Sequence, residues 1–262
     1  MQDVFCELKL TSVAASVCNA LDVAKPNEAN EPLDALVKLC EGKNVDRVLM
    51  YNPDAVALWI FEKYAPLFTP VMLNTSVTLP LQCVMPSVTP VCFGTMYTGA
   101  TPEVHGIQSY TKPVIKTDSV FDALIRAGKK PCIVSTGNDS MSKIFLEREM
   151  DYFIVETPDE ANEKALELIK EDKYDFIAVY NGNYDGTMHR YGPESEESIG
   201  ALKHNINAFE TLANAVKENW QNHKTLIGFA PDHGCHEIDG GCGSHGLYMP
   251  EDMNIVHFYG IS

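Results

Sequence analysis

DFIAVYNGNYDGTMH, residues 175–189, joins a short apolar run to a polar segment that carries a carboxylate and an imidazole. The run from Asp175 to Tyr180 is typical of a strand that is buried on both faces of a sheet. In the segment that follows, Asp185 and His189 are four residues apart, and on a helical turn this spacing puts both side chains on one face. The stretch therefore predicts a buried strand that leads into a ligand-bearing turn.

Similar apolar runs recur along the chain, and amphipathic segments lie between them. The strand candidates are Arg47–Tyr51, Lys130–Ser135, Tyr152–Val155, Asp175–Tyr180, Thr225–Ala230 and Asn254–Tyr259. Helical patterns cover Val120–Ala127, which Gly128 ends, Pro158–Lys170, which Thr157 caps, and Glu194–Trp220. This alternation predicts an α/β fold with a mostly parallel central sheet and helices on both faces. Because no Pro/Gly/Ser-rich linker divides the chain, residues 1–262 are expected to form a single domain.

Composition narrows the classes of partner. The chain has 262 residues and a formal net charge of −16, and such a surface repels nucleic acid, which we discount as a partner, although acidity alone also aids solubility. The start of the chain lacks a signal-peptide pattern, and no run reaches the roughly 18 apolar residues of a membrane span. Eight scattered cysteines without a CxxC pair are typical of reduced thiols. We therefore expect a cytoplasmic protein without a membrane partner.

Three strand candidates end in residues of the metal-binding type. Asp54 follows the first strand, Asp185 and His189 follow the fourth, and Asp232-His233-Gly234 follows the fifth. Gly243-Ser244-His245-Gly246 adds an imidazole between glycines, which let the backbone approach an ion closely. Each motif alone is also typical of a turn or a surface pair. Since ligands of open α/β sheets bind beyond the carboxyl ends of strands, their joint position favours one site.

Thr89-Pro90 is typical of a helix start, with a capping hydroxyl followed by proline at the first helical position. A hydroxyl at that place faces the positive end of the helix, which favours a phosphate group beside it. An ordinary N-cap threonine has the same pattern, so the dipeptide alone does not decide between the two.

The longer segment MPSVTPVCFGTMYTGATPEVHGI, residues 85–107, resembles the nucleophile segment of the type I phosphodiesterase/nucleotide pyrophosphatase family of the alkaline phosphatase superfamily. The family pattern of a threonine, a Thr-Gly helix end and Pro-Glu-x-His-Gly-Ile is met by Thr89, Thr98-Gly99 and Pro102–Ile107. Later family motifs are met by Asp185-x-x-x-His189 with Tyr191-Gly192-Pro193, by Asp232-His233-Gly234 and by Gly243–Gly246. The resemblance extends from about residue 45 to the C-terminus.

The resemblance implies an alkaline-phosphatase-like fold and a metal-dependent hydrolase of phosphate esters with Thr89 as its nucleophile. The implied ligands of one divalent ion are Asp185, His189 and His245, and those of the other are Asp54, Asp232 and His233, with Thr89 reaching it too. A role of Asp54 as a plain helix cap remains the alternative for that residue. Mixed His and Asp ligation suits zinc, with manganese and iron as alternatives. The Thr89 alkoxide would attack a small phosphorylated substrate in line and form a phosphothreonine, which is then hydrolysed.

Two departures from the family pattern concern the substrate. Cys92 stands where the family typically has a phosphate-contacting asparagine, so backbone N–H groups at this helix start are expected to take over. Only eleven residues separate His233 from His245, whereas the nucleotide pyrophosphatases carry a long insertion there. The site is therefore expected to be open, or roofed by residues 65–85 or by another subunit. The substrate and the oligomeric state stay open.

Competing interpretations have their own signatures. A sulfatase is disfavoured, because Thr89 and Phe93 stand where the sulfatase motif Cys-x-Pro-x-Arg has its cysteine and arginine. A phosphate-transferring mutase of the same superfamily and a metal-binding, non-catalytic homologue remain alternatives. So does a structural zinc knuckle, whose ligands would be Cys235, His236, Cys242 and His245. His105 is expected to be structural.

Overall fold

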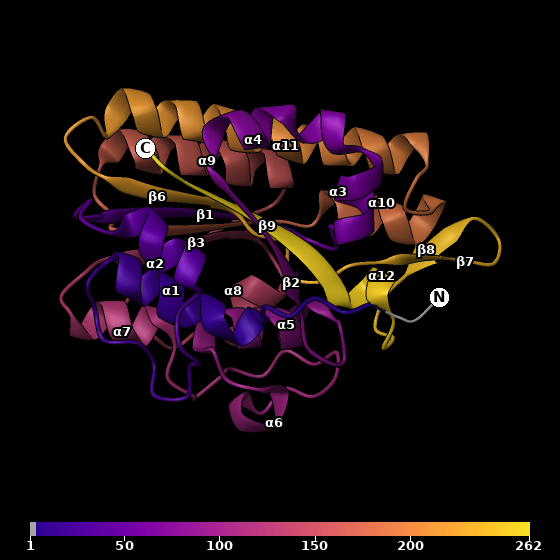
Figure 1. Cartoon of the computed structure of the whole chain (residues 1–262), viewed down its shortest axis with the longest axis horizontal. Coiled ribbons are helices and arrows are strands. Elements are labelled where there is room, and N and C mark those ends of the chain that lie inside the picture. The colour runs from indigo at the N-terminus through magenta and orange to yellow at the C-terminus, as the bar shows by residue number, and fades with distance from the viewer. Residues whose placement is uncertain (1–3) are drawn as a thin grey trace.

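The computed structural model describes residues 4–262 and is built around a seven-stranded sheet with the order β2-β9-β6-β1-β5-β3-β4 (Figure 1). Its strands are β1 (Arg47–Pro53), β2 (Val77–Gln82), β3 (Pro131–Thr136), β4 (Asp151–Val155), β5 (Phe176–Asn181), β6 (Thr225–Phe229) and β9 (Asn254–Ile261). The five strands from β6 to β4 are parallel, and β9 runs antiparallel to both β6 and β2. The predicted mostly parallel sheet is confirmed.

All six strand candidates are present, but the sequence did not predict β2. Pro80 interrupts its pattern, VTLPLQ, and proline is tolerated because β2 lies at the edge of the sheet. A second, two-stranded sheet was also missed. It consists of β7 (His236–Ile238) and β8 (Cys242–Ser244), and it occupies the short segment between His233 and His245.

Helices cover both faces of the sheet, as predicted (Figure 1). One face carries α3 (Leu58–Lys63), α4 (Thr69–Asn74), α9 (Pro158–Glu171), α10 (Asn183–Tyr191) and α11 (Glu196–Asn219). The other carries α1 (Val13–Ala20), α2 (Asp34–Cys40), α5 (Thr89–Thr98), α7 (Val120–Arg126) and α8 (Ser140–Ile144). Short helices are η1 (Leu10–Ser12), η2 (Ala65–Phe68), α6 (Pro102–His105) and α12 (Pro250–Met253). The predicted cap of α9 is confirmed, since the Thr157 side chain accepts from the Glu160 N–H.

The two layers follow from the alternation of side chains along each strand. In β1, Val48 and Met50 belong to one hydrophobic cluster and Leu49 and Tyr51 to the other, and all four are fully buried. Each fully buried side chain of this kind contributes about 1.5–3 kcal/mol relative to an exposed one. The central strands are therefore held from both faces.

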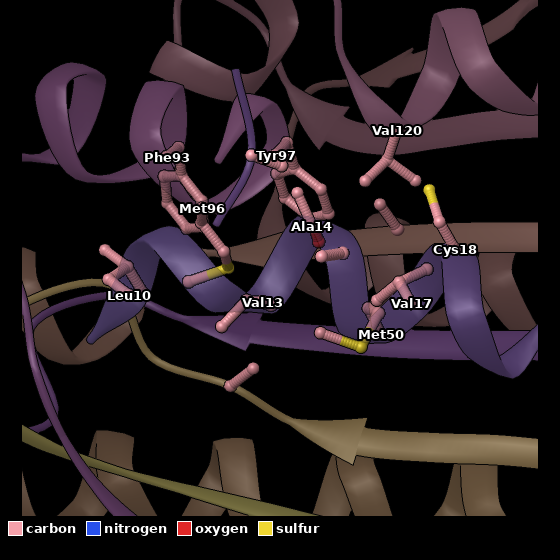
Figure 2. Packing of buried hydrophobic residues seen from close by; sticks show 14 of the residues in the cluster. Leu10, Val13, Ala14, Val17, Cys18, Met50, Phe93, Met96, Tyr97 and Val120 are labelled. Carbon is pink, nitrogen blue, oxygen red and sulfur yellow. The ribbon is translucent and has the colours of Figure 1, made fainter. Parts of the chain in front are cut away.

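The first hydrophobic cluster fixes the position of α5. In Figure 2 side chains of η1 and α1 lie between β1 and α5, and the labelled residues are Leu10, Val13, Ala14, Val17, Cys18, Met50, Phe93, Met96, Tyr97 and Val120. Phe93, Met96 and Tyr97 of α5 are fully buried in this contact. Consequently α5 cannot slide along the sheet without exposing three large side chains.

Two further findings concern the state of the cysteines and the length and polarity of the helices. All eight cysteines are free thiols, as the scattered spacing predicts, and burial raises the pKa of Cys18 to about 12. Within residues 4–262, no helix combines the length and the apolar character that crossing a membrane requires.

Gly234, which follows β6, lies so close to the backbone of Glu251 that a substitution there can test how tightly the chain is packed. An added Cβ would lie 2.0 Å from the Glu251 carbonyl oxygen, and because φ of Gly234 lies outside the left-handed region, close approach rather than turning explains the glycine. We expect Gly234→Ala to lower the free energy of unfolding by about 1–3 kcal/mol, measured by urea denaturation. Gly200→Ala is the control. Gly200 is a residue of α11, and a Cβ added there lies in open space, so this substitution is expected to raise the free energy of unfolding by about 0.5–1 kcal/mol. Equal effects of the two substitutions would contradict this account.

Candidate active site

The candidate site lies at the carboxyl ends of three neighbouring strands, β6, β1 and β5. Asp54 directly follows β1, Asp232 and His233 follow β6, and α10 with Asp185 and His189 follows β5. The structure gathers the predicted ligands into two groups, and within each group the ligand atoms lie within 4.8 Å of one another. The groups are Asp54, Asp232 and His233, and Asp185, His189 and His245. This is the division that the family resemblance implies.

The first group is deeply buried. His233 Nε2 lies 3.3 Å from Asp54 Oδ1 and 3.4 Å from Asp232 Oδ2, and none of the three side chains is more than 1% exposed. Neither of these carboxylate oxygens has a hydrogen-bond partner within the described chain. The other oxygen of Asp232 accepts from the Ala55 N–H at 3.3 Å. Ala55 adopts φ 64°, a strained conformation for alanine, which aims this N–H at Asp232.

The second group lies at the mouth of the site. Asp185 Oδ1 is 3.3 Å from His189 Nε2 and 3.4 Å from His245 Nε2, and the two Nε2 atoms are 3.0 Å apart. The His189 side chain is 43% exposed, whereas that of His233 is fully buried. The rings of His233 and His245 stack with their centroids 4.1 Å apart, so the two groups adjoin. The site thus runs from a closed inner group to an outer group in contact with solvent.

Backbone carbonyl groups orient all three imidazoles. The Nδ1 atom of His189 lies 3.1 Å from the Gly243 oxygen, that of His245 is 2.8 Å from the Ser87 oxygen, and that of His233 is 2.9 Å from the Gly234 oxygen. Because a carbonyl oxygen only accepts, each Nδ1 carries the hydrogen, and the lone pair of each neutral ring lies on Nε2. Metal-binding histidines are usually held in this way.

The charges of the site call for cations. Burial, and then repulsion by Asp185, raises the pKa of Asp54 to about 7. Burial, and then repulsion by Asp54, raises the pKa of Asp232 well above its usual range. Asp54 Oδ1, Asp185 Oδ1 and Asp232 Oδ2 are buried and form no hydrogen bond with any described residue. Three such oxygens beside three imidazole lone pairs are a donor set that fits divalent cations.

Thr89 lies against the inner group. Its hydroxyl donates to Asp54 Oδ2 at 3.3 Å, lies 3.3 Å from His233 Nε2, and belongs to a side chain that is 3% exposed. The prediction that this hydroxyl caps α5 is wrong. Val88 is the N-cap residue, Thr89 is the first helical residue, and no side-chain capping bond forms in this part of the described chain. The hydroxyl is turned toward Asp54 and His233 instead.

The alternative role of Asp54, next to Thr89, is also wrong. Asp54 does not cap a helix, since α3 begins at Leu58 with Ala57 as its N-cap. At the start of α5, the N–H groups of Val91 and Cys92 both donate to the Val88 carbonyl oxygen at 3.0 Å. That backbone N–H groups at this helix start replace the family's asparagine stays a prediction. The Cys92 thiol is buried and lies 3.8 Å from the Val84 carbonyl oxygen.

The structure does not form the zinc knuckle. His236 Nδ1 pairs with Asp252 Oδ1 at 2.6 Å, and Cys242 Sγ lies 3.6 Å from the Arg190 carbonyl oxygen. Across residues 4–262, the groups with metal-ligand geometry are the two described above. His105 is structural, as expected: it is buried, and its Nδ1 accepts from the Ile107 N–H at 3.3 Å.

Tyr180 and Ser87 both contact the site, and the sequence predicted neither contact. The Tyr180 hydroxyl donates to Asp54 Oδ2, although no motif singled Tyr180 out, and only its place at the end of β5 pointed to the site. Residues 69–82 form α4 and β2, which pack against α11 and β9 at the edge of the sheet. Beyond them, Ser87 contacts the site through its carbonyl oxygen.

Comparisons with known proteins agree with this architecture. The family model described as type I phosphodiesterase / nucleotide pyrophosphatase matches residues 54–124 and 136–254. A comparison with curated protein sequences gives no significant match. Murine ectonucleotide pyrophosphatase/phosphodiesterase 5 has a similar structure, with a TM-score of 0.58 and 18% identity over 74% of this chain and 58% of that chain. Phosphonoacetate hydrolase from Sinorhizobium meliloti 1021, solved with phosphonoformate, has a TM-score of 0.56 and 15% identity over 75% of this chain and 59% of that chain.

The matched region covers 58% of the first of these structures and 59% of the second, so this chain spans less than two thirds of their length. Likeness at this level of identity shows a common fold. The alkaline-phosphatase-like fold expected from the sequence is confirmed.

The raised pKa of Asp54 predicts how pH affects the stability of the metal-free protein. Asp54 titrates near 3.8 when unfolded and at about 7 when folded, so the stability that its proton contributes is lost as pH rises toward the folded value. Asp54→Asn removes this dependence. We expect the free energy of unfolding of Asp54→Asn, relative to wild type, to rise by about 1 kcal/mol per pH unit from pH 4.5 to 7.

Urea denaturation with a chelator present measures this difference at each pH. Asp54 also contributes to the raised pKa values of Asp232, His189 and His245, so Asp54→Asn lowers these pKa values too, and this changes the stability difference in the same direction. Parallel pH profiles of the wild type and the variant would contradict the prediction.

Proposed function

Because the chain belongs to the type I phosphodiesterase/nucleotide pyrophosphatase family, a family of hydrolases, we propose that it hydrolyses phosphate esters of small molecules at the site around Thr89. The proposed catalytic unit is a single domain, residues 1–262. One observation carries the proposal: the Thr89 hydroxyl lies 3.3 Å from both Asp54 Oδ2 and His233 Nε2, beside two groups of metal-ligand geometry.

The proposed cofactors are two divalent cations. Asp185, His189 and His245 would hold one, and Asp54, Asp232 and His233 the other. Zinc suits this mixed donor set best, and manganese or iron are the alternatives. When bound, such cations neutralise the buried carboxylates, lower the pKa of a nearby hydroxyl and stabilise charge on phosphoryl oxygens.

In the proposed reaction, Thr89 Oγ1 bonds to phosphorus while the bond from phosphorus to the leaving oxygen breaks. The leaving oxygen takes up the proton that the hydroxyl gives up, and a phosphothreonine results. Water then hydrolyses this ester and restores Thr89. Since α5 begins at Thr89, the positive end of the helix favours the negatively charged phosphoryl group there.

Two structural relatives support the choice of nucleophile and substrate class. A threonine-to-alanine variant of the murine ectonucleotide pyrophosphatase/phosphodiesterase 5 is inactive and was solved with AMP. The S. meliloti phosphonoacetate hydrolase was solved with phosphonoformate. These findings support a threonine nucleophile and a small phosphorus-containing substrate. They also make phosphonate hydrolysis the second candidate function.

The test compares the wild type with Thr89→Ala after reconstitution with zinc or manganese. Substrates are an aryl phosphate monoester, an aryl phosphate diester and phosphonoacetate. We expect turnover of at least one of them, and we expect Thr89→Ala to lower kcat at least about a thousandfold, because the attacking oxygen is absent. Thr211→Ala, an exposed threonine of α11 whose hydroxyl donates to the Asn207 carbonyl oxygen, is the matched control and should keep the wild-type rate.

Metal content is measured on the same samples. If Thr89→Ala kept the wild-type rate with metal bound, the mechanism would be wrong. Absent turnover in metal-loaded wild type would indicate a non-catalytic homologue, and phosphoryl transfer to a sugar hydroxyl in place of water would indicate a mutase.

A further inference from the structure

Tyr180 shares an oxygen atom of Asp54 with Thr89. The Tyr180 hydroxyl and the Thr89 hydroxyl both donate to Asp54 Oδ2. The other oxygen, Asp54 Oδ1, forms no hydrogen bond in the described part of the chain and lies 3.3 Å from His233 Nε2. The two oxygens of this carboxylate are therefore divided between the hydroxyl groups and the inner group of ligand atoms.

The chain makes room for the Tyr180 phenol. A Cβ added at Gly182 would lie 2.9 Å from the phenol oxygen, closer than real Cβ atoms approach. Gly182 has φ −93°, which any residue adopts, so its conformation does not require glycine. Close approach of the Tyr180 hydroxyl does require it.

The Tyr180 ring is also held from the side of α5. Phe93 packs against it edge to face, with the ring centroids 5.6 Å apart and an interplanar angle of 79°. Phe93 lies one helical turn after Thr89, so the same helix positions the hydroxyl and supports the phenol.

We propose that Tyr180 is a positioning residue, whose hydroxyl fixes the Asp54 carboxylate so that Oδ1 faces the inner metal group and Oδ2 receives the Thr89 hydroxyl. Without that bond the carboxylate is free to rotate, and both oxygens lose their assigned directions. The part that concerns Thr89 rests on the proposed function. The part that concerns metal binding is measured without turnover.

The first experiment is a two-step zinc titration of metal-free protein by competition with a chromogenic chelator. In Tyr180→Phe we expect the affinity for one of the two ions to fall 10- to 100-fold, as for other residues that hold a ligand in place, and that for the other ion to stay within about twofold. We expect kcat to fall by a similar factor with KM within about twofold, and the melting temperature of the metal-free protein to fall by no more than about 4 °C, the cost of one lost hydrogen bond.

Tyr174→Phe is the matched control. Its hydroxyl donates to Asp151 Oδ2 at 2.5 Å, so it is the same phenol–carboxylate pair, and its side chain is also buried, but neither residue belongs to the site. Both zinc affinities and kcat should match the wild type in this variant.

The second experiment uses Gly182→Ala in two backgrounds. In the wild type, the added methyl group displaces the Tyr180 hydroxyl and should weaken the same ion as Tyr180→Phe does. In Tyr180→Phe the oxygen that the methyl group meets is absent, so Gly182→Ala should add less than about a twofold loss. Such a non-additive pair is the expected signature of one shared contact.

Wild-type affinity for both ions in Tyr180→Phe would overturn the proposal. So would an equal weakening of both ions together with a lower melting temperature, or independent effects of Tyr180→Phe and Gly182→Ala. If the weakened zinc step appeared while metal-loaded wild type hydrolysed none of the substrates, the proposed function would fail and the positioning role in metal binding would stand.

Discussion

Mutual repulsion among buried carboxylates is the constraint on which this structure depends. Asp54 and Asp232 are almost fully buried, Asp185 lies beside them, and each has an oxygen without a hydrogen-bond partner among residues 4–262. Burying an uncompensated charge costs several kcal/mol even after a protein relaxes. The metal-free fold must therefore hold these groups close together with protons kept on Asp54 and Asp232, whose pKa values are raised, and cations that bind only the folded state would in turn stabilise it.

The sheet supplies that restraint. Because β6, β1 and β5 are neighbours, their carboxyl ends bring together residues that are far apart in the sequence, and two hydrophobic clusters prevent the strands from separating. The hydroxyl comes from a different direction, on α5, which is itself anchored by η1 and α1 (Figure 2). Helices carry Thr89, Asp185 and His189, whereas the other ligand residues lie in the connections that directly follow β1, β6 and β8. The turn after β1 includes Ala55, whose strained conformation the surrounding packing tolerates.

Local patterns account for what the sequence predicted. The six strands, the long helices and the i, i+4 pair on α10 all follow from periodicity, which depends only on nearby residues. The edge strand β2 was missed because Pro80 is acceptable only at a sheet edge, and an edge is a property of the whole fold. Tyr180 was missed for a related reason: its partner Asp54 is 126 residues away, so no local pattern contains the contact. The cap at Thr89 was misplaced because long-range contacts with Asp54 and His233 compete for its hydroxyl.

The β7–β8 hairpin between His233 and His245 has a consequence for how such sites diversify. It is a surface turn whose two ends are fixed by the imidazoles, one in each ligand group. Lengthening a flexible loop costs only about 0.6 kcal/mol for each doubling of its length. A longer loop at the turn of this hairpin would therefore cost little stability, provided that β8 keeps the Gly243 carbonyl oxygen beside His189 Nδ1. In this chain eleven residues fill the position, and the surroundings of the proposed site could lengthen here without any change to the ligand residues themselves.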